Sequence, residues 1–95
     1  MATVSVANTA TSIIAKNSGR GSLVMENVDA SKTVFWGVDN TVTTANGMQL
    51  LAGERMIWTY DGDFEASRFF YRGAFFGIVA SGTADVRVQE FTDQY

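Results

Sequence analysis

The stretch Asp85-Val86-Arg87-Val88-Gln89 alternates polar and apolar side chains. Successive side chains of a β-strand point to opposite faces of the sheet. The stretch therefore predicts a strand whose Val86 and Val88 side chains face a core, while the polar side chains between them face water. This pattern is typical of a half-buried antiparallel strand.

A second stretch, Arg55-Met56-Ile57-Trp58-Thr59-Tyr60, follows the same period of two residues. Its large side chains Met56, Trp58 and Tyr60 fall on one face, and we expect that face to be buried. Helical spacing of apolar residues is not evident, so the pattern favours strands over helices.

Outward from these two stretches, short runs rich in Val, Ile, Phe, Trp and Thr recur between Gly, Asn, Asp and Ser residues. We expect strands at residues 3–7, 12–16, 22–28, 33–38, 47–51, 55–60, 74–80 and 85–91. About eight short strands with this spacing are typical of a sandwich or barrel. The predicted fold is all-β, a compact antiparallel β-sandwich, and both jelly-roll-like and immunoglobulin-like strand orders fit the pattern.

The chain has 95 residues, of which 46% are hydrophobic and 18% charged. This composition supports one packed domain over residues 1–95, and the length is too small for two. The absence of histidine and cysteine excludes imidazole bases, thiolate nucleophiles, disulfides and the usual zinc sites. We therefore expect no enzyme, no catalytic residues, no cofactor and no metal. The formal net charge of −3 argues against nucleic acid as a partner.

Three acidic residues, Asp61, Asp63 and Glu65, occupy alternate positions in one predicted turn. Oxygen ligands for Ca²⁺ often begin in this way, but a calcium loop also needs a Glu at its twelfth position, where Arg72 stands. We favour an ordinary solvated turn, and cation binding by these carboxylates stays an open alternative.

Basic residues give no clear ligand site. Arg68 and Arg72 flank Phe69-Phe70-Tyr71, a mixture that could stack the bases of a single strand, but the other basic residues form no stripe. Gly19-Arg20-Gly21 lacks the glycine spacing of a phosphate loop and predicts a flexible turn. The longest apolar run, residues 74–80, is too short to span a membrane, and the start lacks the features of a secretory signal. We expect no membrane partner and synthesis in a cytoplasm.

Two segments, residues 33–36 and 75–79, are apolar on both faces. A small two-layer sandwich covers only one face of each strand, so something else must cover the other. Aromatic residues gathered at 69–76 add to this surplus, which commonly marks a partner surface. A long loop folded over the sandwich is an equal alternative. The predicted interface residues are Phe69, Phe70, Tyr71, Phe75 and Val79, together with Val4 and Val6 from the N-terminal segment.

Residues 1–21 are mainly Ala, Thr, Val, Ser and Asn, with only Lys16 and Arg20 charged. Such a segment fits an N-terminal arm that adds to the sheet edge of a neighbouring molecule through backbone hydrogen bonds. It also fits two ordinary strands of the same sandwich, which is the interpretation we favour.

The central and C-terminal parts of the chain contain three short motifs in order. They are VTTANG at residues 42–47, AGE at residues 52–54 and IVASGTADVRV at residues 78–88. Each motif consists of residue types that are typical of turns and strands. Their combination, over roughly residues 33–90, resembles a module of small virion proteins of tailed bacteriophages. Within that group the chain looks most like a head decoration (cement) protein.

The resemblance implies a compact β-sandwich that is a structural part of the virion and has no catalytic residues. It implies a protein on the capsid surface that binds the outer face of the major capsid protein lattice and stabilises the capsid. A trimer or dimer on a lattice symmetry axis would follow from that position. Similar modules in tails and fibres imply an alternative, a module that binds a host receptor or carbohydrate with Trp36, Trp58 and Tyr60 as an aromatic platform.

Overall fold

The computed structural model describes residues 2–59 and 71–92, and every regular element in these residues is a β-strand. The strands are β1 (Ala2–Val6), β2 (Thr11–Ile14), β3 (Arg20–Asn27), β4 (Val34–Gly37), β5 (Met48–Leu50), β6 (Arg55–Thr59), β7 (Phe75–Ile78) and β8 (Ala84–Thr92). Each begins and ends within two residues of a strand predicted from the sequence. The all-β prediction is confirmed.

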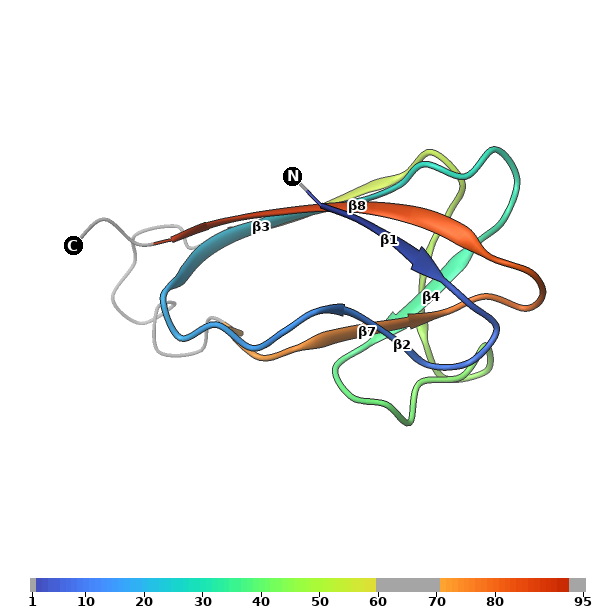
Figure 1. The fold of residues 1–95 in the computed structure, drawn as a ribbon, viewed down its shortest axis with the longest axis horizontal. Helices are drawn as coiled ribbons and strands as arrows, with labels where there is room; N and C mark the ends of the chain where they lie inside the picture. The colour runs from blue at the N-terminus through green and yellow to red at the C-terminus, as the bar shows by residue number, and fades with distance from the viewer. Residues whose placement is uncertain (1, 60–70, 93–95) are drawn as a thin grey trace.

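The strands form two four-stranded antiparallel sheets, which are the upper and lower layers in Figure 1. Sheet A has the order β1-β8-β3-β6, and sheet B has the order β2-β7-β4-β5. Along the chain, β1 pairs with β8, β2 with β7, β3 with β6 and β4 with β5. A long hairpin of paired strands rolled over itself in this way is a jelly roll. Of the two strand orders that fit the sequence, the chain therefore adopts the jelly roll.

One hydrophobic core lies between the inner faces of the sheets. In β8, Val86 and Val88 are buried while Asp85 and Arg87 are exposed, as the alternation predicts. The buried core residues are Val6, Ile13, Leu23, Met25, Val34, Leu50, Phe75, Val79, Ala84, Val86 and Val88.

The inner face predicted for β6 is also found. Met56 and Trp58 pack against the core, whereas Ile57 between them is 59% exposed. Tyr60, predicted on the same face, lies outside the described residues.

The N-terminal segment forms two strands of the chain's own sandwich. β1 pairs with β8 over its whole length, from Ala2 opposite Val88 to Val6 opposite Ala84. Val6 and Ile13 are 0% and 4% exposed, so both strands contribute to the core. The interpretation of residues 2–14 as ordinary strands describes this chain, and a detached arm does not.

Two turns require glycine. Between β5 and β6, the Glu54 N–H donates to the Leu51 C=O at 2.8 Å, and Gly53 between them has φ of 79°. The third position of a type II turn needs such a positive φ, which glycine adopts without strain. Gly82, between β7 and β8, has φ of 67° for the same reason.

Arg20, the first residue of β3, is completely buried at one end of the sandwich. Its Nε donates to Glu90 Oε2 at 2.9 Å, Nη1 donates to the Gly73 C=O at 2.9 Å, and Nη2 donates to the Ala15 C=O at 3.0 Å. The guanidinium lies over the ring of Phe75, 5.6 Å from its centroid. Ala15 follows β2 and Gly73 precedes β7, so Arg20 links sheet A to the segments that bound sheet B.

Asn27, the last residue of β3, links the sheets at the other end of that strand. It is also completely buried. Its Nδ2 donates to the Lys32 C=O at 2.8 Å and to the Leu50 C=O at 2.9 Å, and its Oδ1 accepts from the Asp29 N–H at 3.0 Å. Because Leu50 belongs to β5, this amide joins sheet A to sheet B.

Candidate interaction surfaces

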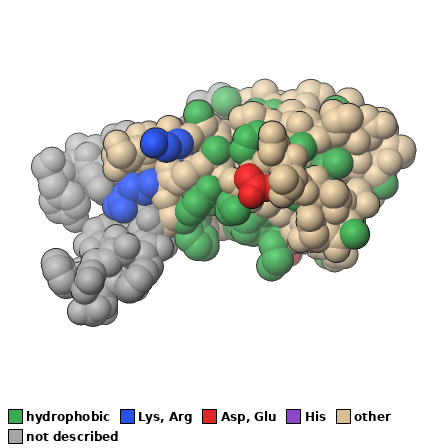
Figure 2. All heavy atoms as spheres, turned by 90° about the horizontal axis from the view of Figure 1, so that it is seen from below, with side chains coloured by type: hydrophobic (Ala, Val, Ile, Leu, Met, Phe, Trp, Pro, Cys, Tyr) green, Lys and Arg blue, Asp and Glu red, His purple; other side chains and the backbone are tan. Residues whose placement is uncertain are grey.

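Sheet B presents an outer face on which apolar side chains predominate. None of its four strands, all within the described residues, contains Asp, Glu, Lys or Arg. Phe75 and Gly77 of β7 are buried, so Phe76 and Ile78 point outward, and Phe35 of β4 lies directly opposite Ile78. These three outward side chains are only partly buried. Figure 2, which views the molecule from the side of sheet B, shows hydrophobic side chains (green) over the middle of this face, with acidic side-chain atoms (red) among them.

Further apolar side chains are exposed where the strands of sheet B end. Val38 after β4 is 52% exposed, Met48 in β5 is 62% exposed and Leu51 after β5 is 50% exposed. Met48 lies opposite Trp36, which packs against the core, so its side chain is on the inner side of β5 and does not belong to the outer face.

Sheet A presents a charged outer face. One row across its strands reads Thr3, Arg87, Glu26 and Arg55, each residue opposite the next. The Arg55 Nη2 lies 3.7 Å from Glu26 Oε2 in an exposed ion pair. Ile57, the neighbour of Arg55, is an exposed apolar side chain on the same face, so this face is mixed rather than wholly polar.

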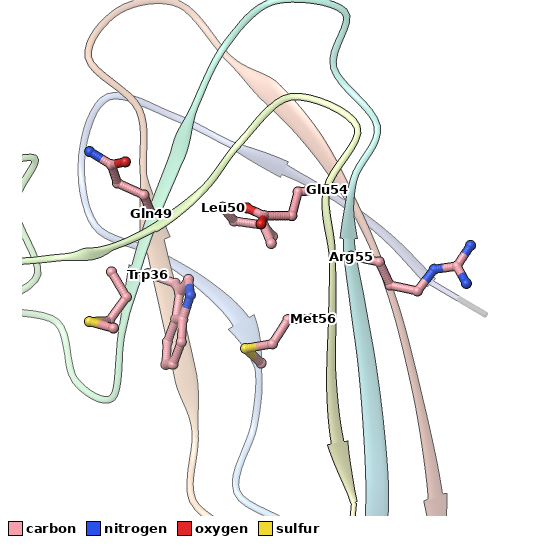
Figure 3. A pocket seen from close by; sticks show the side chains of 7 residues that line it. Trp36, Gln49, Leu50, Glu54, Arg55 and Met56 are labelled. Carbon is pink, nitrogen blue, oxygen red and sulfur yellow. The ribbon is translucent and has the colours of Figure 1, made fainter.

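A groove of about 180 Å³ opens between the edge strands β5 and β6. Figure 3 shows Trp36 and Met56 directed into it from the two sheets, whereas Arg55 points away. Trp58 is held inside the sandwich, where its Nε1 donates to the Tyr71 C=O at 3.1 Å. Trp36 and Trp58 both pack against the core, so these two rings do not share an exposed platform.

A second hollow, of about 380 Å³, lies on the opposite side of the sandwich between β1 and β2. Apolar side chains supply much of its lining, among them Ala2, Ile13, Ile14 and Val88. The polar residues of its lining are Gln89 and Glu90, and the Glu90 carboxylate already accepts from Arg20.

The structure corrects part of the predicted interface. Phe75, Val79 and Val6 are at most 1% exposed and belong to the core of one chain. The sequence shows that β7 is apolar on both faces but does not say which face turns inward. The outward residues of β7 are Phe76 and Ile78, and these replace Phe75 and Val79 as interface candidates.

The remaining predicted interface residues have other places. Val4 is partly buried against the core. Tyr71 packs edge-to-face on Phe75, with ring centroids 5.1 Å apart, and its hydroxyl donates to the Ala74 C=O at 2.6 Å. Phe69 and Phe70 lie outside the described residues.

Other candidates from the sequence give no site in the part of the chain that the structure describes. Asp61, Asp63, Glu65 and Arg68 lie outside that part. In the remainder, no cluster of three or more acidic side chains could hold a metal ion. Arg72 donates from Nε to the Arg20 C=O at 2.8 Å, which ties it to the buried end of β3.

The predicted flexible turn at Gly19-Arg20-Gly21 is wrong in part. The Gly19 N–H donates to Asn17 Oδ1 at 3.0 Å in a turn, but Arg20 begins β3 and is buried. The sequence reasoning therefore missed a buried side chain that makes three hydrogen bonds.

Two carboxylates, the partly buried Asp29 and the exposed Asp39, organise loops. Asp29 accepts from the N–H groups of Ser31 and Lys32, and these bonds hold the pKa of Asp29 below its ordinary value. Hydrogen bonds from the hydroxyl and N–H of Thr41 lower the pKa of Asp39 in the same way. Both carboxylates serve local turns rather than a ligand site.

No family model, curated protein or solved structure matches the chain. None of the described elements is a helix long and apolar enough to cross a membrane. Function must therefore be inferred from these surfaces and from the residues that carry the phage resemblance.

Proposed function

We propose that this chain is a structural virion protein of a tailed phage, which binds the outer face of the major capsid protein lattice and stabilises the capsid. The resemblance over roughly residues 33–90 supplies the class of protein. The outer face of sheet B, whose strands carry no charged residue, is the observation that supports it, because a decoration protein needs a surface to bury against the coat and needs no catalytic group.

The residues of that face suit an interface. Phe35, Phe76 and Ile78 stand on neighbouring hydrogen-bonded strands and are partly exposed. The centres of protein interfaces are enriched in aromatic residues and depleted in charge. We therefore place sheet B against the coat and leave the charged row of sheet A in water.

The first experiment is the copy number of this chain in purified virions, measured by quantitative mass spectrometry against the coat protein. A number comparable to the coat is expected for a protein that covers the lattice. A handful of copies would overturn the lattice proposal and favour the alternative, a receptor- or carbohydrate-binding module at a vertex or tail tip. Absence from the virion would refute both.

A matched pair of variants tests the surface. Ile78→Thr alters the outer face of sheet B, and Val24→Thr makes a similar change on the outer face of sheet A, where Val24 is also partly buried. Burial of an aliphatic side chain is worth about 1.5–3 kcal/mol. We expect Ile78→Thr to weaken co-sedimentation with undecorated capsids about tenfold or more, and Val24→Thr to leave it unchanged. Equal binding by both variants would refute this orientation.

A further inference from the structure

The free edge of β1 differs from the other edges of the two sheets. β2 has an irregular register between Ser12 and Ile14, β5 has three residues, and β6 begins with the exposed Arg55. Bulges, short length and charge are devices that keep an edge strand from pairing with another chain. β1 has five residues in unbroken register, and its sequence Ala-Thr-Val-Ser-Val carries no charge. Among the described strands, none pairs with its outer side.

The backbone groups on that outer side can be identified. The Val28 N–H donates to the Asp85 C=O at 3.0 Å, so the backbone of Asp85 points toward β3. In an antiparallel sheet, successive residues direct their backbone groups to opposite sides. Asp85 lies opposite Ser5, which makes this pair the type without mutual hydrogen bonds. Val4 and Val6 therefore bond to β8, and the N–H and C=O groups of Thr3 and Ser5 point outward.

Charges on the neighbouring strand select one register for a second copy of β1. Thr3 lies opposite Arg87, and Ser5 lies opposite Asp85. If Thr3 met Thr3 of a second copy, two Arg87 side chains would share a row. If Ser5 met Ser5, two Asp85 side chains would share a row. Only the pairing of Thr3 with Ser5 puts Arg87 of one copy in the same row as Asp85 of the other, about three strand spacings away, and so keeps like charges out of one row.

The inner face of β1 also lacks full cover. Its inward residues become more exposed toward the beginning of the strand: Val6 is fully buried, Val4 is partly buried and Ala2 is exposed. The hollow of about 380 Å³ lined by Ala2 and Ile14 lies along this same side. In the Thr3–Ser5 register, Val6 of a second copy would lie opposite Ala2, and the two Val4 residues would lie opposite each other. The second copy would therefore cover Ala2, which one chain leaves exposed, and Val4, which it leaves partly exposed.

We propose that β1 pairs antiparallel with β1 of a second copy of this chain. The twofold axis of this dimer passes between the Val4 residues of the two copies. Thr3 of each copy pairs with Ser5 of the other, and the two residues exchange both of their backbone hydrogen bonds. The two sheets A then form one continuous sheet across an isologous interface. This inference does not depend on the proposed function, because it concerns the purified chain without a coat.

Sedimentation velocity over a range of concentrations, with a proline variant, tests the pairing. Thr3→Pro removes an N–H that points outward and leaves the bonds to β8 in place, and an edge strand tolerates such a proline. Thr3→Val keeps the N–H and is the matched control. We expect a dimer for the wild-type chain and for Thr3→Val. By symmetry Thr3→Pro loses a bond at both Thr3–Ser5 pairs, which should weaken the dimer roughly ten- to a hundredfold.

Amide hydrogen exchange of the wild-type chain keeps the test decisive if the proline variant does not fold. The amides of Thr3 and Ser5 should become protected as concentration rises, while those of Val4 and Val6 stay protected at every concentration. A chain that is monomeric throughout, a dimer that Thr3→Pro leaves unchanged, or Thr3 and Ser5 amides whose exchange ignores concentration would each overturn the proposal.

Discussion

Sheets A and B each have four strands, but their chemistry is opposite. All charged residues that lie on the described strands belong to sheet A, in β3, β6 and β8. Sheet B has none. Sheet A also supplies Arg20 and Asn27, the two buried polar side chains among the described residues. Their partners on the side of sheet B are backbone carbonyls of Ala15, Gly73 and Leu50.

This difference assigns stability mainly to one sheet of the sandwich and leaves a face of the other sheet free for binding. Sheet A holds the layers together and keeps one face compatible with water. Sheet B contributes only apolar side chains and backbone to the shared core, so its outer face is left free to be apolar. Changes in the polar residues of sheet A should therefore affect stability, whereas changes on the outer face of sheet B should affect binding.

The largest expected effect comes from Arg20→Met. The change removes the hydrogen bonds to Glu90, Gly73 and Ala15 and leaves the Glu90 carboxylate, 25% exposed, without its cation. Removal of one partner of a buried ion pair costs about 3–5 kcal/mol. Urea unfolding followed by circular dichroism should show a loss of this size.

The double variant Arg20→Met with Glu90→Leu sharpens the same test. Replacement of both partners by apolar side chains of similar volume is often neutral or stabilising compared with the loss of one. We expect the double variant to be more stable than Arg20→Met alone. If it is equally unstable, the Arg20 bonds to backbone carbonyls carry the effect and the ion pair does not.

Asn27→Ala should have the second largest effect. It removes the buried Asn27 amide, which is the hydrogen-bond partner of the Lys32 and Leu50 carbonyls and of the Asp29 N–H. Unsatisfied buried polar groups cost about 1–3 kcal/mol. We expect a loss of about 2 kcal/mol in thermal or urea unfolding, and a loss below that of Arg20→Met. An effect as small as that of an exposed substitution would show that water replaces the amide.

The sequence predicted the strands because each strand has one face in the core, and a period of two is visible without knowing the neighbours. It could not predict the order of the strands, since alternation states which face is buried and not which strand lies alongside. The jelly roll follows from pairings such as β1 with β8, which join residues far apart in the chain.

The polar links between the sheets were predictable in part. The alternation that buries Val86 and Val88 also turns Glu90 inward, so a buried carboxylate could have been expected there. Arg20 could not be placed in this way, because the register of β3 shifts between Arg20 and Ser22 and a bulge changes the face on which a side chain lies. The interface candidates Phe75 and Val79 failed for a related reason, because β7 is apolar at every position.

Glu26→Gln tests the outer face of sheet A and should have a small effect. The Arg55–Glu26 pair is 3.7 Å long, and the side chain of Arg55 is 59% exposed. Exposed ion pairs contribute about 0–1 kcal/mol. We expect a change in unfolding free energy within about 0.5 kcal/mol, and a larger loss would show that this row of charges also holds sheet A together.

The smallest effect is expected at Asp29, and it should depend on pH. Its pKa is below the ordinary value of 3.8 because the N–H groups of Ser31 and Lys32 donate to the carboxylate. A carboxylate with a lowered folded pKa stabilises the fold above its unfolded pKa, and that contribution is lost as the pH falls through the folded pKa. Asp29→Ala should therefore lower the melting temperature slightly at pH 7, and the gap from the wild type should narrow as the pH falls below about 4. A gap that stays constant or widens in acid would mean that the Asp29 side chain stabilises the loop through packing and not through its ionised carboxylate.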